Sequence, residues 1–290
     1  LLVCLSGSFN AQARTARVLV LNSYPAGPQW NAEFDRGLRQ ATVEQSIWLF
    51  TRQISPSANP DASYRMAQDE LLKQTLLYYQ FDLVVSVGEQ ALTQLLDLQD
   101  QELLQVPVIA AGADLSAYMG ASGRLLSGIH EQLPLRENLL LIRQLVPDLE
   151  AIHLLTDDSP TGQQIRNNFV QLAKQFAISY TLWQGHNYEE VKAKTSQLSR
   201  NQAVLLGNMQ LSKIGQKPLS EQAIASLSEA SRAPLFSLWG GAIGQGAVGG
   251  FVSLPNTLGE AVGQMLNQVL QGTDIRDIPI EARPPQPYLF

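Results

Sequence analysis

The chain has 290 residues, of which 45% are hydrophobic and 16% are charged, so it can fill a large core and is not an intrinsically disordered protein. Its 26 acidic and 20 basic residues give a formal net charge of -6, which argues against nucleic acid or an anionic membrane as a partner. One cysteine, Cys4, allows neither an intramolecular disulfide nor a thiolate metal cluster.

The first 13 residues, LLVCLSGSFNAQA, have the pattern of the end of a secretory signal peptide. A short apolar run closes on Ala11-Gln12-Ala13, the A-x-A pattern at which signal peptidase cleaves. We therefore interpret residues 1–13 as a signal-peptide remnant and expect an exported, periplasmic protein, free or tethered to the inner membrane within a longer chain. No other apolar run approaches the roughly 20 residues that span a bilayer.

Short apolar runs rich in β-branched residues alternate with amphipathic segments along the rest of the chain. Near-continuous hydrophobicity is typical of parallel strands that are covered on both faces. Helical spacing is clear in 161–176 and in the last amphipathic segment, which Gly272 is placed to end. This alternation predicts a doubly wound α/β fold. The expected strands are 17–22, 47–51, 83–87, 107–111, 151–155, 178–183, 203–206 and 234–238.

The strand and helix pattern starts again near Ala151, which predicts two similar lobes. Each half opens on a strand that ends in a polar, Pro-containing loop before a helix. We expect two Rossmann-like lobes joined by crossover strands, which form a hinge that suits closure around a ligand. Lobe 1 is predicted to comprise 14–126 and 254–278, lobe 2 to comprise 127–253, and 279–290 to be an extended C-terminal segment.

Motifs that would indicate catalysis are weak. Gly244, Gly246 and Gly249 match GxGxxG by letters, but a strand-like run follows them instead of a helix, so a hinge is the better interpretation. The pair Asp157 and Asp158 lies in a strand-to-helix loop, where aspartate commonly caps a helix. The three histidines, at positions 130, 153 and 186, are scattered. The sequence therefore predicts no enzyme, no catalytic residue, no metal site and no cofactor.

Polar and aromatic residues at the carboxyl ends of the predicted strands form the candidate binding site, because ligands of open α/β sheets bind there. The facing loops of two lobes are expected to close over a small molecule. The candidate ligand-binding residues are Asn22, Ser23, Tyr24, Trp30, Gly88, Glu89, Gly112, Ala113 and Asp114 from the first half, and Asp157, Ser159, Thr161, Gly162, Asn208, Trp239 and Gly240 from the second.

The residue types at these strand ends suggest the chemistry of the ligand. Backbone N–H groups at the helix starts after Ser23, Gly88 and Pro160 can hold a carboxylate or another anion. Acidic Glu89, Asp114 and Asp157 can hold an amine instead. A zwitterion would use both, which favours an amino acid or a related metabolite.

Several segments resemble the ABC-transporter substrate-binding-like family of periplasmic binding proteins. They include VLVLNSYPAGPQWNAEFDRGL, VVSVGEQAL, PVIAAGADL, the run from SGIHEQLPL to DDSPTGQQI, and LGEAVGQMLNQVLQG, which together cover about Arg17 to Pro279. The NSYP-x4-W opening looks most like members that serve as extracytoplasmic sensor domains of histidine kinases and diguanylate cyclases. The resemblance implies two lobes, a ligand cleft and no catalysis, with Ser23, Tyr24 and Trp30 contributed by one lobe and Asp157, Thr161 and Gly162 by the other.

We expect first a periplasmic sensor domain that binds a small molecule and passes lobe closure to a membrane signalling protein, in the same chain or as a partner. The alternative is the free-standing solute-binding component of an ABC transporter, whose partner would be a permease. A sugar-binding-type transcription regulator would need an N-terminal helix-turn-helix and a basic patch, neither of which the sequence has. A flavodoxin-like enzyme would need a cofactor site that we do not find.

Overall fold

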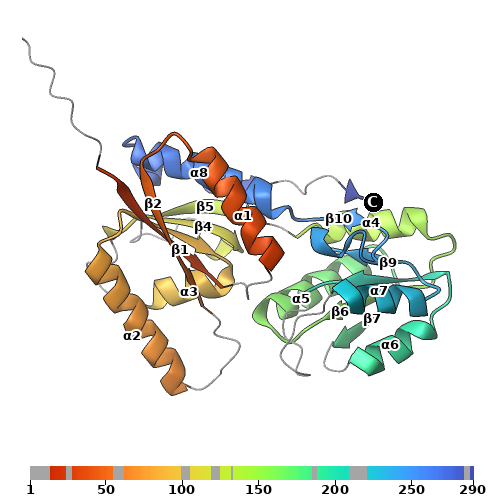
Figure 1. Ribbon diagram of the computed structural model, residues 1–290. Coiled ribbons are helices and arrows are strands. Elements are labelled where there is room, and N and C mark those ends of the chain that lie inside the picture. Colours follow the sequence, from red (N-terminus) through yellow and green to blue (C-terminus); the bar gives the residue numbers. More distant parts are fainter. Residues whose placement is uncertain are drawn as a thin grey trace, which may run out of the picture.

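The computed structural model shows two α/β lobes side by side (Figure 1). No helix among the described residues is both long and apolar enough to cross a lipid bilayer. The described residues are 14–23, 28–54, 62–98, 105–118, 125–131, 133–184, 188–208, 221–283 and 288–290.

The first lobe is built on a six-stranded sheet in the order β11-β5-β4-β3-β1-β2, in which all neighbours pair in parallel. Its central strands are apolar and buried on both faces, as the near-continuous hydrophobic runs predict. The strands are β1 (Ala16–Asn22), β2 (Ile47–Gln53), β3 (Leu83–Val87), β4 (Val108–Ala113), β5 (Leu126–Glu131) and β11 (Glu281–Arg283). The helices are α1 (Pro28–Ala41), α2 (Ala62–Tyr79), α3 (Glu89–Asp97), the short η3 (Ser116–Tyr118), α8 (Pro255–Leu270) and the short η5 (Ile275–Asp277).

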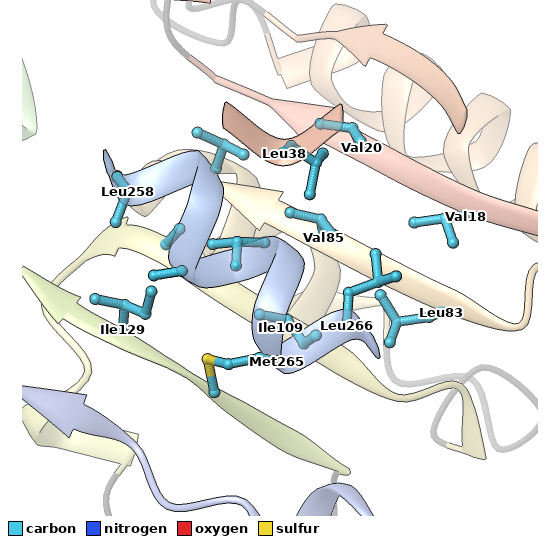
Figure 2. Close-up of a cluster of buried hydrophobic side chains, with 14 of the residues drawn as sticks. Val18, Val20, Leu38, Leu83, Val85, Ile109, Ile129, Leu258, Met265 and Leu266 are labelled. Carbon is cyan, nitrogen blue, oxygen red and sulfur yellow. The ribbon is translucent and has the colours of Figure 1, made fainter. Parts of the chain in front are cut away.

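Helix α8 returns from the second lobe and packs against α1 on one face of this sheet. The two backbones come very close, because a Cβ added at Gly259 would lie 2.1 Å from the carbonyl oxygen of Phe34, and one added at Gly37 would lie 2.0 Å from that of Asn256. Figure 2 shows the apolar side of α8 gathered with side chains of the sheet and of α1. The two glycines therefore allow α8, which follows the second lobe in the chain, to pack closely on α1 and complete the first lobe.

The second lobe contains a four-stranded parallel sheet in the order β7-β6-β8-β9. The prediction of an α/β fold with two parallel sheets flanked by helices is thereby confirmed. The strands are β6 (Ala151–Thr156), β7 (Tyr180–Gln184), β8 (Gln202–Leu206) and β9 (Leu235–Ser237), with a small antiparallel pair β10 (Gly250–Phe251) and β12 (Tyr288–Leu289). The helices are α4 (Leu135–Leu145), α5 (Pro160–Gln175), α6 (Tyr188–Ser196), α7 (Glu221–Ala230) and the short η4 (Gly240–Ala242).

The chain crosses between the lobes at two described connections, from β5 to α4 and from β10 to α8. Strand β5 pairs with β4 and β11, so residues 127–131 lie in the first sheet although the sequence placed them in lobe 2. The predicted boundary between residues 126 and 127 divides this strand, because the periodicity of a crossing strand does not show which sheet it joins. The Gly-rich 240–253 packs against β9, with bridges from Phe236 to Gly249 and from Trp239 to Ser253.

The described parts of the C-terminal segment, 279–283 and 288–290, lie against different lobes. Its β11 extends the first sheet beside β5, while β12 pairs with β10 beside the second sheet. Residues 1–13, expected to be a signal-peptide remnant, lie outside the described residues.

Candidate functional site

A cavity of about 470 Å³ lies between the two lobes. Its lobe 1 wall is made by the carboxyl end of β4, the start of α3 and the end of β5, as expected for a ligand site in an open α/β sheet. Its lobe 2 wall is made mainly by α4 and α5, with Trp239 after β9. The six lining residues of lobe 1 are Glu89, Gly112, Ala113, Asp114, Ser116 and His130.

Two carboxylates lie together on the lobe 1 wall. The backbone N–H of Asp114 donates to Oε2 of Glu89 at 3.0 Å. Oδ1 of Asp114 accepts from the N–H of Ser116 at 2.9 Å and from its hydroxyl at 2.5 Å, which fixes the turn into η3. Gly112, at a φ of 65°, allows the irregular end of β4 that aims this turn at lobe 2.

The surroundings shift the pKa values of these two carboxyl groups in opposite directions. Burial raises the pKa of Glu89, and the adjacent Asp114 charge adds to this, against a lowering by the Asp114 N–H. Burial also opposes ionisation of Asp114, but the hydrogen bonds from Ser116 and Gln164 and the charge interaction with His130 together outweigh it, so the pKa of Asp114 is lowered. Asp114 is therefore the more firmly ionised member of the pair.

His130 supports the same turn from the neighbouring strand. Its Nδ1 accepts the N–H of Leu115 at 3.0 Å and lies 3.5 Å from Oδ1 of Asp114. The same ring also lines the cavity.

A hydrogen bond between side chains links the two lobes across the cavity. Nε2 of Gln164 on α5 donates to Oδ2 of Asp114 at 3.0 Å. The carboxylate of Asp114 thus uses one oxygen within its own loop and turns the other toward the opposite lobe.

Helix α5 presents a row of neutral polar side chains to the cavity. It begins at the cap Ser159, whose hydroxyl accepts the N–H of Gly162 at 3.0 Å, and has Pro160 in its first turn. Its lining residues extend from Thr161 to Gln175, which is about 21 Å of helix axis at 1.5 Å per residue. They include four carboxamides at helical spacing: Gln164, Asn168, Gln171 and Gln175.

Six of the candidate residues predicted from the sequence line this cavity: Glu89, Gly112, Ala113, Asp114, Thr161 and Trp239. The indole N–H of Trp239 donates to the carbonyl oxygen of Gly207 at 3.1 Å, so the ring is held by lobe 2. A polar loop on one lobe therefore faces a tryptophan and a helix start on the other, which is the juxtaposition that a closing cleft requires.

Other candidates of the second lobe form a buried network behind the cavity wall. Asp157 has no exposed surface, and its Oδ1 accepts from the N–H and the hydroxyl of Ser159 at 3.1 and 2.5 Å. The Asn208 amide donates to both oxygens of Asp157 at 3.3 Å and to the hydroxyl of Ser159 at 2.8 Å. A Cβ at Gly162 would lie 2.3 Å from the carbonyl oxygen of Asp157, so glycine is needed there.

Candidates of the first lobe beside β1 also lie away from the lining. Asn22 donates to Asn31 at 2.8 Å, and the hydroxyl of Ser23 donates to the carbonyl oxygen of Val87 at 3.0 Å. The Trp30 ring stacks on Phe34 with a centroid distance of 5.6 Å. Gly88 precedes α3 and Gly240 begins η4, and neither lines the cavity. Tyr24 lies outside the described residues. Ligand contact by this group stays a prediction.

The sequence did not point to the carboxamides of α5 or to Ser116, Arg136 and Glu137, which also line the cavity. The carboxamides fall on the polar side of an amphipathic pattern, which is usually a solvated face. Their one available signal was the recurrence of Gln and Asn at steps of four, three and four between 164 and 175.

Among the described residues, no group of three or more His, Cys, Asp or Glu side chains could hold a metal ion. His153 is buried against Trp183 with a centroid distance of 4.7 Å, and its Nδ1 lies 2.6 Å from the Thr181 hydroxyl. Burial lowers the pKa of His153, as for a structural histidine.

Comparisons with solved structures agree with the two-lobe fold. A conserved domain protein from Vibrio cholerae aligns with a TM-score of 0.71 at 12% identity, over 96% of this chain and 92% of that one. An ABC domain from Streptococcus pneumoniae in complex with L-Trp aligns with a TM-score of 0.70 at 17% identity, over 94% and 91%. A carbohydrate transporter from Acidothermus cellulolyticus in complex with myo-inositol gives 0.66 at 13% identity, over 95% and 94%. At these identities the likeness concerns the fold.

The sequence itself matches a known family. The family model described as ABC transporter substrate binding protein matches residues 34–286, and no curated protein gave a significant sequence match. Since the match covers most of the chain, the protein belongs to the ABC transporter substrate binding protein family. This is a family of binding proteins, not of enzymes, and it supports the transporter alternative better than the sensor domain that the sequence first suggested.

Proposed function

We propose that this member of the ABC transporter substrate-binding family captures a small polar solute between its lobes and delivers it to a membrane permease. The observation that carries the proposal is the cavity of about 470 Å³, lined by polar side chains from both lobes. This volume falls within the range of roughly 300–1,000 Å³ for small-molecule sites. Family membership supports the same function.

The arrangement of the walls explains how binding would be coupled to closure. The walls belong to different lobes, and the described connections between the lobes are short stretches at residues 131–135 and 251–255. A solute that contacts both walls stabilises the closed arrangement over the open one by the difference in its binding free energy for the two. A permease can then distinguish the loaded protein by its shape.

We place the protein outside the cytoplasm, where solute-binding components meet their ligands. The A-x-A pattern at residues 11–13 and the family support an exported, periplasmic protein. No catalytic step is part of the proposal. Two of the structurally similar proteins were solved with chemically different solutes, L-Trp in one and myo-inositol in the other, so they do not identify the ligand of this chain.

A thermal-shift screen of the purified protein against a metabolite library tests this function, with native mass spectrometry to detect a co-purified solute. A bound solute is expected to raise the melting temperature, because it stabilises only the folded state. Asn168→Trp, which fills the cavity from α5, should reduce the affinity at least tenfold, whereas Asn167→Trp on the exposed side of the same helix should not. Equal binding by both variants would place the site elsewhere, and a library without binders would refute the function.

An experiment in cells distinguishes a transport role from a sensor role. Deletion of the gene should reduce uptake of the identified solute, and the wild-type gene should restore it. Normal uptake together with loss of a transcriptional or second-messenger response to the solute would favour the sensor role instead.

A further inference from the structure

Ionised groups on the cavity wall are unbalanced in sign. Among the described lining residues, Glu89, Asp114 and Glu137 supply three carboxylates and Arg136 supplies one guanidinium. Counting a protonated His130, which lies 3.5 Å from Oδ1 of Asp114, as a second cation still leaves the carboxylates in excess. A solute entering this cavity therefore meets an excess of negative charge.

The guanidinium does not neutralise the carboxylates of lobe 1. The Cζ atom of Arg136 lies 5.8 Å from the ring centroid of Phe176, at the end of α5, in a cation–π contact. Within the described residues, the salt bridges do not include one from a lysine or arginine to Glu89, Asp114 or Glu137. Glu89 and Asp114 therefore lie together, half-buried, without a cationic partner from lysine or arginine.

Their oxygens are arranged to receive a donor from lobe 2. Oδ1 of Asp114 is occupied by Ser116, while Oδ2 accepts Nε2 of Gln164 at 3.0 Å. The carboxylate of Glu89 is held beside it by the Asp114 N–H. A neutral carboxamide thus occupies a position where a cation would interact more strongly, because an ammonium brings a full positive charge to the carboxylate and a carboxamide brings only a dipole.

We infer that the cavity selects a solute carrying a protonated amine, which binds between Glu89 and Asp114 and displaces the Gln164 carboxamide from Asp114. This rests on the proposed solute-binding function and names its substrate class. The ammonium relieves the repulsion between two neighbouring carboxylates in a partly desolvated site. The carboxamides along α5 then serve the neutral polar groups of the same solute, since each offers both donors and an acceptor.

The experiment uses amine and alcohol pairs included in the metabolite library: putrescine with 1,4-butanediol, D-glucosamine with D-glucose, and tryptamine with tryptophol. The tightest binders in the library should carry a basic nitrogen, and replacing it by a hydroxyl should weaken binding at least tenfold. Binders without a basic nitrogen, or equal binding of both members of a pair, would overturn the amine inference and leave the solute-binding function standing. A library without binders would refute both.

Variants locate the amine within the cavity. Glu89→Gln with Asp114→Asn should weaken binding of the tightest amine at least tenfold, while Asp97→Asn, on the exposed side of α3 outside the cavity, should not. Gln164→Ala removes the competing donor and should bind the amine at least as tightly as the parent. This second variant keeps the test valid if the first misfolds, since a tenfold loss in Gln164→Ala would contradict the displacement.

Discussion

Asp157 is a carboxylate with no exposed surface, and the loop before α5 depends on its hydrogen bonds. It accepts from Ser159 and Asn208, while Arg166 donates to its backbone carbonyl oxygen. Burying a charge is tolerated only when it is hydrogen-bonded in this way. The network sets the start of α5, and α5 carries much of the cavity wall.

Asp157→Ala should therefore act mainly on stability. It leaves the donors of Ser159 and Asn208 without their acceptor in a buried place, and we expect the free energy of unfolding to fall by about 3 kcal/mol. The measurement is equilibrium urea unfolding. Asp158→Ala is the control, because its ion pair with Arg166 at 3.8 Å is partly exposed and should contribute less than about 1 kcal/mol. Similar losses in both variants would contradict the network.

Glu89 should give the stability a pH dependence that its amide variant lacks. Its pKa is raised in the folded state, chiefly by burial, so folding favours the protonated form. The stability associated with this group is present below the pKa of the unfolded chain and is lost as pH rises through the folded pKa. Glu89→Gln, whose side-chain oxygen can still accept the Asp114 N–H, should gain stability relative to the parent as pH rises.

Urea unfolding of the parent and of Glu89→Gln between pH 4 and pH 8 measures this difference. Asp97→Asn, on the same helix but exposed, serves as the reference variant. A difference between Glu89→Gln and the parent that stays constant over the range would mean that Glu89 titrates alike in the folded and unfolded chains.

At the scale of elements, the pairing of α1 with α8 depends on backbone approach. Gly259 and Gly37 each lie where a Cβ would overlap a carbonyl of the partner helix. Because of this pairing, α8, which follows the second lobe in the chain, covers one face of the first sheet. The chain therefore leaves the first lobe after β5 and returns to it at α8.

Gly259→Ala should lower the free energy of unfolding by about 2 kcal/mol or more, because the added methyl group forces the two helices apart. Gly241→Ala is the matched control, since a Cβ there meets nothing within 4 Å. Thermal unfolding followed by circular dichroism compares the two variants. A neutral Gly259→Ala would show that the helices separate at little cost.

At the scale of the whole molecule, the cavity lies between two lobes whose walls are linked by the hydrogen bond from Gln164 to Asp114. A bound solute would add contacts to both walls and shift the population toward closure.

Small-angle X-ray scattering should show a smaller radius of gyration when the solute found in the screen is added. At 100 times the Kd, binding should also add about 2.7 kcal/mol to the stability. At the same solute concentration, the Asn168→Trp variant, whose affinity is at least tenfold lower, should gain no more than about 1.4 kcal/mol. An unchanged radius of gyration in the parent at saturation would mean that binding occurs without closure.

Local patterns were enough to predict eight strands of the two main sheets and the two-lobe α/β class, because burial on both faces of a parallel sheet requires apolar runs that are visible in one dimension. The family was identified from the resemblance of whole segments, not from these patterns. The lobe 1 candidates Glu89 and Asp114 were predicted for a related reason, since the carboxyl ends of parallel strands meet at one edge. Strand β5 was divided between the two predicted lobes, because the periodicity of a crossing strand does not show which sheet it joins.

Only the tertiary structure showed which polar residues line the cavity. Asp157 and Thr161 belong to one loop and helix start, yet one is buried in a network and the other lines the cavity. Asp114 and Gln164 are 50 residues apart and meet only because the second lobe is docked against the first. Which side chains come together across a cleft depends on how the two lobes are placed relative to each other. Local sequence periodicity reports only the secondary structure of each segment and does not contain this placement.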